Sequence, residues 1–407
     1  MLGDKRLLRT IRLRNLLSFG PDSEEIELKS LNVLVGANGA GKSNLIEAIA
    51  LLRATAGDLT APVRAGGGVA EWLWKGASVT PNAEIEVTVY YPDGMMPLRH
   101  TFSFSMVGQR FELLDESVEN EQPEFSPADD VRFFYRYQRG RPVLNMRSLG
   151  GDNAANGHTR IDRRLQREDL APDQSVLSQR KDPDQYPEIT YLGNCYNRIK
   201  LYQEWDLGRH TPARLPQKVD LPNDFLLEDA SNLGLVLNDL THRGQVKAEL
   251  FERLKQFYAS FRDLTTYLLG GTLQIFFHED DLQQPIPATR LSDGTLRFLC
   301  LASILCHPNP PPLVCIEEPE IGLHPDILPI IAELLVAASH RTQLIVTTHS
   351  DILVDALSDT PEAILICEKD HGTTALRRLD KESLQEWLAA YSLGDLWRSG
   401  ELGGNRW

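Results

Sequence analysis

Residues 36–43 read Gly-Ala-Asn-Gly-Ala-Gly-Lys-Ser and fit the pattern G-x-x-x-x-G-K-[ST]. The glycines allow backbone N–H groups to close around phosphate oxygens, and the Lys42 ammonium can contact the β- and γ-phosphates. The Ser43 hydroxyl can ligate Mg²⁺. The pattern predicts that ATP and Mg²⁺ are bound by these residues and the next one: Gly36, Asn38, Gly39, Ala40, Gly41, Lys42, Ser43 and Asn44.

Paired carboxylates end a second apolar run, because residues 313–320 read Leu-Val-Cys-Ile-Glu-Glu-Pro-Glu. A strand beside the phosphate-binding strand can deliver one carboxylate to the Mg²⁺ shell and a second to orient and deprotonate water. We assign Glu317 to the metal ion and Glu318 to the catalytic water. The same letters also suit a solvated helix start, since acidic residues and proline favour first turns. The phosphate-loop pattern favours the catalytic interpretation.

Two further motifs flank the carboxylates. Residues 291–295 read Leu-Ser-Asp-Gly-Thr and precede an apolar helical pattern, which alone would be an ordinary helix N-cap. Residues 344–350 read Leu-Ile-Val-Thr-Thr-His-Ser. They predict a strand with His349 at its carboxyl end, where ligands bind in open α/β sheets. A single histidine there is often structural, so the order of the motifs carries its catalytic interpretation.

Local patterns supply the elements that must position these residues. The apolar run 31–35 predicts a strand and 44–52 a helix, on either side of the phosphate-binding pattern. Alternation in 7–14 and 24–28 predicts a hairpin. The remaining expected elements are an antiparallel sheet from 83–91, 99–106 and 110–115, an acidic surface loop at 115–130, helices in 173–205 and 228–262, and a strand at 272–278.

Composition limits the class of protein. The 407 residues are 42% hydrophobic, enough for a sizeable core, and no apolar run approaches the roughly 18 residues of a membrane span. The charged N-terminus resembles no secretory signal, and five scattered cysteines without a C-x-x-C pair suit a reducing compartment, so we expect a cytoplasmic protein. The net charge of −15 argues against a surface coated in basic residues.

One stretch is strongly basic nonetheless. Residues 131–167 hold nine arginines against two aspartates, interleaved with Phe133, Phe134, Tyr135 and Tyr137. Arginine reaches phosphates and aromatic rings stack on bases, so DNA binding is one interpretation. A solvated or intersubunit face that balances the acidic remainder is the other interpretation.

The order of the motifs resembles the ABC-type ATPase heads of the SMC/RecF group, and more closely the predicted ATPases related to the OLD (overcoming lysogenization defect) family. Residues 11–19, Ile-Arg-Leu-Arg-Asn-Leu-Leu-Ser-Phe, look like the first strand of that group. Residues 317–325, Glu-Glu-Pro-Glu-Ile-Gly-Leu-His-Pro, are the more specific match, and 391–407 also look like stand-alone ATPases of this kind. The resemblance covers roughly 5–55 and 285–407.

The resemblance implies an α/β fold of the P-loop NTPase class, with an ABC-type head, an antiparallel β lobe and a mixed helical insertion. It implies a homodimer with two ATP molecules between one subunit's phosphate loop and the other subunit's signature. Ser292 and Gly294 would contact the γ-phosphate in trans, residues 320–325 would cross the dimer interface, and His349 would sense the γ-phosphate. We expect three parts: the first half of the head with the β lobe at 1–115, the insertion at 116–262, and the second half of the head at 263–407.

The chain departs from the pattern of that group at three points. Glu317 replaces the usual Asp, and Asp293 replaces the usual Gly of the signature. The glutamine that normally follows the phosphate-loop helix is unassigned, with Gln109 and Gln138 as candidates. The insertion also lacks sustained heptads, which excludes a long coiled-coil arm.

These observations leave two functional hypotheses. About 60 residues follow His349, too few for the Toprim metal domain of OLD nucleases, so we expect nuclease or toxin activity in another polypeptide. The first hypothesis is an ATPase that dimerises on ATP and switches a separately encoded effector in phage defence. The second is a RecF-like protein that uses ATP to clamp DNA. Membrane transport is disfavoured because the motifs are OLD-like.

Overall fold

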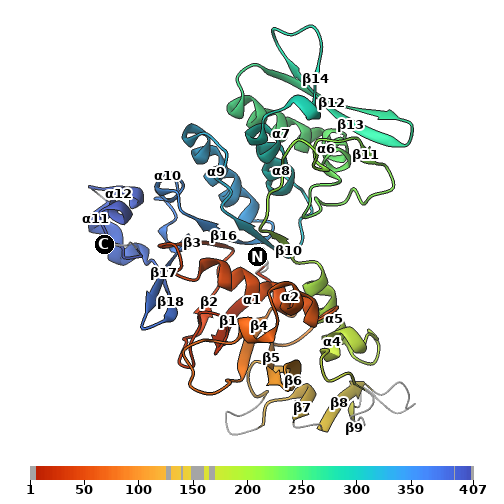
Figure 1. The fold of residues 1–407 in the computed structure, drawn as a ribbon, viewed down its shortest axis with the longest axis vertical. Coiled ribbons are helices and arrows are strands. Elements are labelled where there is room, and N and C mark those ends of the chain that lie inside the picture. The colour runs from red at the N-terminus through yellow and green to blue at the C-terminus, as the bar shows by residue number, and fades with distance from the viewer. Residues whose placement is uncertain are drawn as a thin grey trace. The chain divides into compact units, whose positions relative to one another are not determined.

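The computed structural model describes residues 6–124, 130–138, 141–147, 160–164, 170–388 and 390–404. The chain divides into two compact units, and Figure 1 labels their helices and strands. Unit 1 comprises Met1–Lys29, Ala37–Ile199 and Cys367–Arg377, and unit 2 comprises Ser30–Gly36, Lys200–Ile366 and Arg378–Trp407.

Unit 1 contains an eight-stranded sheet in the order β2-β1-β4-β5-β6-β7-β8-β9, antiparallel throughout. Apolar and polar residues alternate along its strands, as in β4, because one face packs on a core. The predicted hairpin and antiparallel sheet are therefore confirmed. The strands are β1 (Leu8–Arg14), β2 (Ile26–Glu27), β4 (Ala83–Val89), β5 (Leu98–Val107), β6 (Arg110–Asn120), β7 (Phe133–Gln138), β8 (Arg141–Arg147) and β9 (Arg160–Arg164).

The predicted acidic loop at 115–130 is wrong over its first residues, because β6 continues to Asn120. Buried and partly exposed residues alternate along its end: Glu116 and Val118 are buried, while Glu119 forms ion pairs with Arg99 and Arg136. Cross-strand pairing therefore stabilises a strand that composition alone predicts to be a loop. Residues 125–129 of that prediction lie outside the described residues.

The helices of unit 1 lie beside this sheet. The predicted phosphate-loop helix is confirmed as α1 (Lys42–Ala54), whose Leu45, Ile46, Ile49 and Leu52 are buried at helical spacing. The other helices are α2 (Thr60–Ala65), α3 (Val69–Trp72), α4 (Val176–Gln179) and α5 (Pro187–Asn197).

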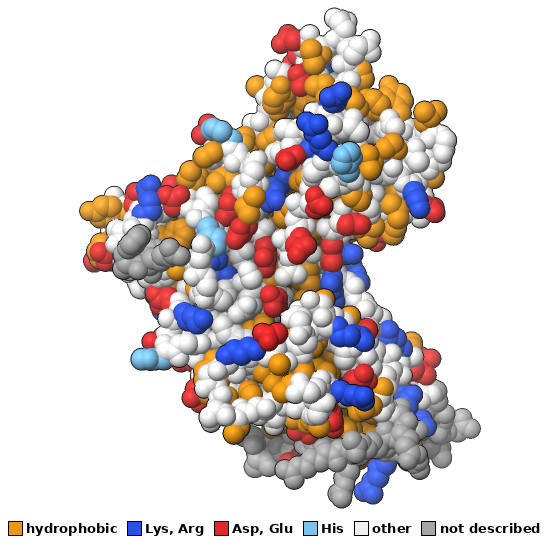
Figure 2. Space-filling view, viewed as in Figure 1, with side chains coloured by type: hydrophobic (Ala, Val, Ile, Leu, Met, Phe, Trp, Pro, Cys, Tyr) orange, Lys and Arg blue, Asp and Glu red, His pale blue; other side chains and the backbone are white. Residues whose placement is uncertain are grey.

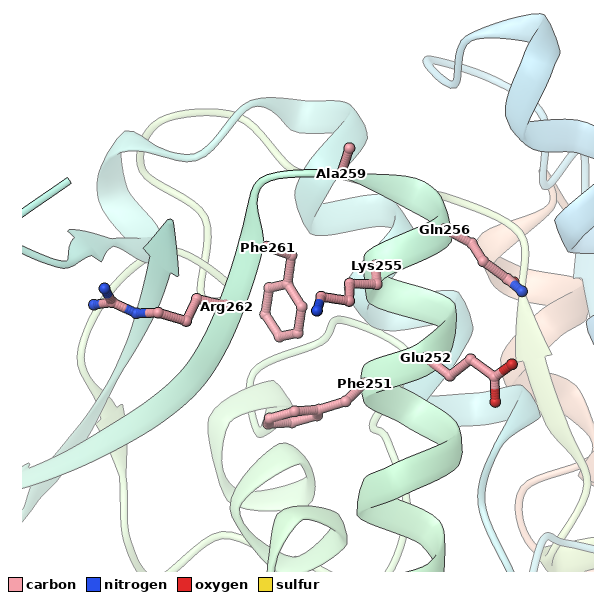
Figure 3. Close-up of a pocket in the computed structure, with 7 residues that line it drawn as sticks. All are labelled: Phe251, Glu252, Lys255, Gln256, Ala259, Phe261 and Arg262. Atoms are coloured by element: carbon pink, nitrogen blue, oxygen red, sulfur yellow. The ribbon is translucent and has the colours of Figure 1, made fainter. Parts of the chain in front are cut away.

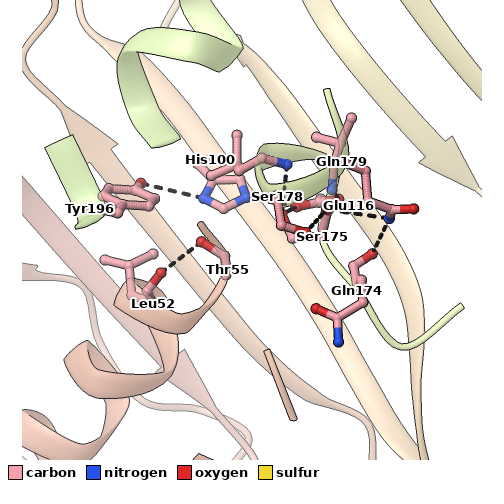
Figure 4. Close-up of polar contacts among 11 residues, drawn as sticks. Leu52, Thr55, His100, Glu116, Gln174, Ser175, Ser178, Gln179 and Tyr196 are labelled. Atoms are coloured by element: carbon pink, nitrogen blue, oxygen red, sulfur yellow. Dashed lines mark hydrogen bonds and ion pairs between the residues drawn. The ribbon is translucent and has the colours of Figure 1, made fainter. Parts of the chain in front are cut away.

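Between β5, β6, α4 and α5 lies a buried polar network of His100, Glu116, Ser175 and Tyr196 (Figure 4). Glu116 accepts hydrogen bonds from the Ser175 hydroxyl and, at 2.9 Å, from the Val176 N–H. Its carboxylate also lies 3.2 Å from His100 Nε2, and His100 Nδ1 lies 3.3 Å from the Tyr196 hydroxyl. Buried polar groups are stable only when paired in this way, so the network fixes α4 and α5 on the strands.

The central sheet of unit 2 has the order β10-β15-β16-β3-β17-β18, and β10, β15, β16, β3 and β17 run parallel. β3 reads Leu-Asn-Val-Leu-Val and is buried at every position, as expected for a parallel strand covered on both faces. The strands are β3 (Leu31–Val35), β10 (Lys200–Tyr202), β15 (Leu313–Glu317), β16 (Gln343–Thr348), β17 (Ile364–Asp370) and β18 (Thr373–Arg378), with residues 367–377 counted in unit 1.

A second sheet of unit 2 pairs β12 with β13 and β13 with β11 and β14. The predicted helical stretches therefore end early: β10 lies within 173–205, and β12 begins within 228–262. The Phe257 ring stacks on Phe298 at 4.2 Å between α7 and α8. These elements are β11 (Gln217–Lys218), α6 (Leu233–Thr241), α7 (Gly244–Phe257), β12 (Phe261–Leu269), β13 (Thr272–Glu279), β14 (Ile286–Pro287) and α8 (Asp293–Leu305).

The remaining helices of unit 2 include α9, which contacts β3 and β16, and α10, which contacts α12. The helices are α9 (Leu328–Ser339), α10 (Asp351–Asp355), α11 (Lys381–Leu388) and α12 (Leu393–Arg398), with short 3-10 turns at Ala288–Arg290, Pro325–Ile327 and Pro361–Ala363. The described residues thus form an α/β fold with an antiparallel lobe, as predicted.

Candidate functional site

The phosphate loop has the backbone that its glycines predict. Gly39 and Gly41 have φ of 79° and 103°, a region that favours glycine. Gly41 begins α1 without a side-chain hydrogen bond to the helix terminus, so the first-turn N–H groups suit a phosphate. The buried Lys42 folds back over the loop, and its Nζ donates to the Ala37 carbonyl oxygen at 3.1 Å. Asn38, Gly39 and Ser43 are exposed.

Side chains from distant segments support this loop from behind. The Ala40 carbonyl oxygen accepts hydrogen bonds from Thr374 Oγ1 at 2.8 Å and Cys367 Sγ at 3.2 Å. Ser18 Oγ lies 2.6 Å from both Thr374 Oγ1 and Asn44 Nδ2. A Cβ at Gly41 would collide with Thr374 and Ser18. The loop is therefore held in a shape that only glycine fits, as a phosphate cradle requires.

The paired carboxylates lie at the carboxyl edge of the parallel sheet, where Glu317 is the last residue of β15 and Glu318 the first residue after it. Glu317 is in register with Thr347 of β16, and Thr348 is in register with Val35 at the end of β3. Gly36, the first residue of the phosphate pattern, therefore follows β3 at the edge where Glu317 ends β15. This is the arrangement that neighbouring strands of a nucleotide-binding sheet provide.

Glu318 lies just beyond the strand and is conformationally unusual. Its φ is 44°, in the left-handed region that residues with a Cβ rarely adopt. Its N–H donates to the Thr347 carbonyl oxygen at 3.0 Å. Its carboxylate is one-third exposed, and Oε1 lies 3.5 Å from His349 Nε2. The structure thus brings Glu318 and His349 together, with the carboxylate open to water.

Glu320 fixes the backbone of the histidine segment. Its Oε1 accepts hydrogen bonds from Thr348 Oγ1 at 2.7 Å and from the His349 N–H at 2.8 Å. Sequence patterns place Glu320 only in the loop 320–325, so they miss this role. The geometry makes Glu320 a brace between that loop and the end of β16.

The signature begins α8 as a capped helix. Ser292 Oγ accepts a hydrogen bond from the Thr295 N–H at 3.0 Å. A Cβ on Gly294 would lie 2.7 Å from the Gly322 carbonyl oxygen, so the absent side chain allows loop 320–325 to touch the signature backbone. Ser292 and Gly294 are therefore near that loop in the same chain.

A buried arginine explains the unusual Asp293. The Arg214 side chain is 4% exposed and forms an ion pair with the largely exposed Asp293 carboxylate. It also donates to the Leu291 carbonyl oxygen at 2.5 Å and to that of Leu207 at 2.7 Å. Asp293 is thus the partner of a buried charge, which would be costly to leave unpaired. Sequence patterns give no signal for Arg214.

The candidate glutamines lie in unit 1. Gln109 has φ of 68° in the exposed turn between β5 and β6, and Gln138 ends β7. Neither follows α1 directly, where α2 and α3 come next. The assignment of a nucleotide-contacting glutamine stays a prediction.

The side chains predicted to bind Mg²⁺ carry oxygen atoms, the kind of ligand that this ion prefers. In the described ranges no group of three or more His, Cys, Asp or Glu side chains could hold a metal ion alone. Mg²⁺ is commonly held by one or two protein oxygens together with substrate phosphates and water. The Ser43 hydroxyl and the Glu317 carboxylate are protein oxygens of that kind.

The arginine-rich stretch offers less to nucleic acid than its composition indicates. Arg132 pairs with Glu124 and Arg136 with Glu119. Phe134, Tyr135 and Tyr137 are buried, so these rings are unavailable for base stacking. Arg163 and Arg164 of β9 are exposed, whereas Arg139, Gly150–His158 and Arg167 lie outside the described residues. Acidic and basic side chains are intermixed over the face in Figure 2.

A cavity of about 620 Å³ lies between α7 and β12 in unit 2. It is lined by Phe251, Glu252, Lys255, Gln256, Ala259, Phe261 and Arg262 (Figure 3). The motif residues do not line it. Among the helices in the described part of the chain, none has the length and apolarity needed to cross a membrane.

Comparisons with known proteins show which family the sequence matches and which solved structures share the fold. The sequence model of the family described as "AAA domain, putative AbiEii toxin, Type IV TA system" matches residues 31–355. The Old nuclease of Escherichia phage P2 is 26% identical over an alignment of 184 residues, and the match covers 39% of this chain and 31% of that protein. The chain thus spans less than a third of the length of this curated relative.

Two solved structures share the fold. An SMC head bound to the C-winged helix domain of ScpA has a TM-score of 0.55 at 14% identity, over 93% of this chain and 99% of that chain. An Smc head with an extended coiled coil, bound to the C-terminal domain of ScpA from Pyrococcus furiosus, has a TM-score of 0.54 at 14% identity, over 94% and 98%. At this identity the likeness shows the fold alone.

The fold and the motifs define an ABC-type P-loop ATPase of the SMC/OLD group. Within that class, the chain belongs to the AAA domain family described above, whose model covers most of its length.

Proposed function

We propose that this protein binds and hydrolyses ATP with Mg²⁺, and that Glu318 is the base that activates the attacking water. The observation that carries the proposal is the Glu318 carboxylate: it directly follows β15, is one-third exposed, and lies 3.5 Å from His349 Nε2. An open carboxylate with a neighbouring histidine can accept a proton from water and orient it. ATP, when bound, supplies the phosphoryl group and its leaving group.

The other residues have separate tasks in this proposal. The phosphate loop and Lys42 bind the phosphates, while Ser43 and Glu317 ligate Mg²⁺. Ser292 and Gly294 complete the site from a second subunit. Because the capped N-terminus of α8 carries a positive dipole, it suits the γ-phosphate across that interface.

The experiment is to compare Glu318→Gln with Glu252→Gln, an exposed glutamate on α7. Loss of the base should lower phosphate release by about 10²–10⁴-fold while ATP binding persists. The Glu318→Gln protein should then collect as an ATP-bound dimer in size exclusion with light scattering. Unchanged hydrolysis in Glu318→Gln would contradict the assignment of the base, and a monomer at saturating ATP would contradict the dimer.

The biological role that we propose is a switch for a separately encoded effector. The family description names a toxin–antitoxin system, and the partial relative is a nuclease. Tagged Glu318→Gln protein, purified with ATP from its native host, should carry a stoichiometric nuclease-like or toxin-like protein. Recovery of DNA alone would move the proposal to the RecF-like clamp.

The RecF-like alternative rests on Arg163 and Arg164, which are exposed on the edge strand β9. If they contact phosphates, ATP-dependent DNA binding should weaken steeply with salt, and replacing both arginines with alanine should flatten the salt dependence. Binding that is absent or insensitive to salt would remove this alternative.

A further inference from the structure

Two side chains outside the motifs hold the backbone of the paired carboxylates. Trp205 Nε1 donates to the Glu317 carbonyl oxygen at 3.4 Å, and an Arg297 N–H donates to that of Glu318 at 3.1 Å. The Arg297 guanidinium lies 5.1 Å from the centre of the Trp205 ring, within cation–π range. The Trp205 ring also stacks on Tyr202, with centroids 5.5 Å apart and planes 17° from parallel. We call Trp205 and Arg297 the carbonyl clamp.

The clamp contacts the chain where it is strained. A residue with a Cβ keeps a left-handed φ such as the 44° of Glu318 only when its surroundings determine that conformation. Hydrogen bonds on both sides of Glu318 do so here: the Thr347 carbonyl oxygen accepts its N–H, and Arg297 donates to its carbonyl oxygen. The direction of the carboxylate follows from this backbone conformation.

Both clamp residues are linked to the signature: Arg297 lies on α8, which the signature begins, and Trp205 lies in a segment that contacts Asp293. Arg297 lies one turn into α8 and carries the one charge in residues 294–306. It is 7% exposed, and burial lowers its pKa. Trp205 lies in the segment 203–216 between β10 and β11, and Arg214 of the same segment pairs with Asp293. A shift of α8 or of this segment would therefore move the carbonyl oxygens behind the carboxylates.

We propose that Trp205 and Arg297 are positioning residues that aim the Glu318 carboxylate at the water, so that the state of the signature helix controls ATP hydrolysis without controlling ATP binding. The inference rests on the proposed function of Glu318. It assigns a coupling role to the segment 203–216, which the motifs do not include.

The test uses Arg297→Met and Trp205→Phe, which remove the donors while they keep much of the packing. Because mispositioning by small distances is costly, we expect kcat to fall by about 10–100-fold for Arg297→Met and less for Trp205→Phe, with the Kd for ATP within about twofold. Arg297→Lys, which keeps one donor, should restore part of kcat. Arg253→Met is the matched control, since Arg253 pairs with Glu333 on the outside of unit 2.

A double-mutant cycle separates positioning from stability. In the Glu318→Gln background, neither clamp substitution should lower slow single-turnover hydrolysis further, because its target carboxylate is gone. Equal losses in both backgrounds, or a parallel loss of ATP affinity, would overturn the clamp. If Arg297→Met does not fold, Trp205→Phe decides alone. Full hydrolysis by Glu318→Gln would instead contradict the proposed base, while full kcat in the clamp variants with an inactive Glu318→Gln would contradict only the clamp.

Discussion

Two glutamates, Glu116 of unit 1 and Glu318 of unit 2, show how surroundings decide what a carboxylate can do. Glu116 is 1% exposed, and its oxygens contact a hydroxyl, a backbone N–H and a histidine. The Glu318 carboxylate is one-third exposed and has His349 beside it at 3.5 Å. The two side chains are identical, but only the second is accessible to solvent water.

The comparison distinguishes a structural carboxylate from a reactive one. The carboxylate oxygens of Glu116 accept hydrogen bonds from groups within the fold, so Glu116 stabilises the contacts of α4 and α5 with the strands. Glu318 keeps solvent access, and its strained backbone is restrained by donors to neighbouring carbonyl groups. Satisfied polar groups stabilise a fold, whereas open ones on a fixed backbone are available for chemistry.

The sharpest test makes the same change at both positions. Glu116→Gln should lower the free energy of unfolding by about 2–4 kcal/mol, because a neutral amide places a donor among donors in a buried site. Glu318→Gln should change stability by less than about 0.5 kcal/mol, as for exposed substitutions, yet abolish most hydrolysis. Urea unfolding and phosphate release on both variants measure this. Equal destabilisation would erase the distinction.

Lys42→Ala separates the binding of ATP from its hydrolysis. The ammonium is buried beside the Ala37 carbonyl oxygen, and in the proposed function it contacts the phosphates of ATP. We expect ATP affinity to fall by about 100-fold or more, since a charge-assisted contact is lost, whereas Glu318→Gln keeps its affinity. Equilibrium binding of a fluorescent ATP analogue measures this; matching affinities for the two variants would contradict the separate roles.

Gly294→Ala tests the close approach between the backbone of the signature and that of loop 320–325. Its Cβ would lie 2.7 Å from the Gly322 carbonyl oxygen, so the loop must shift at a cost of about 1–3 kcal/mol. Gly244→Ala is the control, because beyond the adjacent residues and its own helix backbone no atom lies within 4 Å of the added Cβ. Thermal unfolding and hydrolysis should both suffer in the first variant and neither in the second. If Gly294→Ala changed neither thermal unfolding nor hydrolysis, loop 320–325 would be able to shift at little cost in free energy.

Thr374→Val probes an intermediate case, a buried hydrogen bond that supports the phosphate loop. Removal of the bonds to Ala40 and Ser18 should cost about 1–2 kcal/mol of stability. ATP affinity should weaken with it, because Ala40 belongs to the loop. Thr373→Val is the neighbouring control. Normal affinity despite the loss of stability would limit Thr374 to the fold.

The smallest effect concerns the buried thiols. Burial raises the pKa of Cys300, Cys306 and Cys367 from 9 to about 12. A thiol that stays protonated in the folded state and ionises in the unfolded state stabilises the fold below about pH 9, and that contribution is lost as pH rises toward 12. In urea unfolding, the contribution of these thiols to the free energy of unfolding should therefore be constant near neutral pH and should decline above about pH 9. Replacing the three cysteines with alanine should reduce the slope of that decline.

Much of the fold and motif set could be predicted because its signals are local. Three of these signals are each contained in a short run of the sequence: the strand 31–35, the glycine pattern 36–43 and the Glu-Glu pair 317–318. Trp205, Arg214 and Thr374 could not be found that way, because their partners lie up to hundreds of residues away in sequence. Arg297 did carry a signal: a single charge in an apolar helix must find a buried partner.

The contact of Gly294 with Gly322 has a consequence for the kinetics of an ATP-bound dimer. In the proposed sandwich, loop 320–325 faces the partner subunit while its backbone touches the signature of its own chain. In that dimer, a change at either nucleotide site would reach the signature of each subunit through loop 320–325. We expect the two sites to turn over cooperatively, with a sigmoidal dependence of hydrolysis on ATP concentration that becomes hyperbolic when this contact is broken.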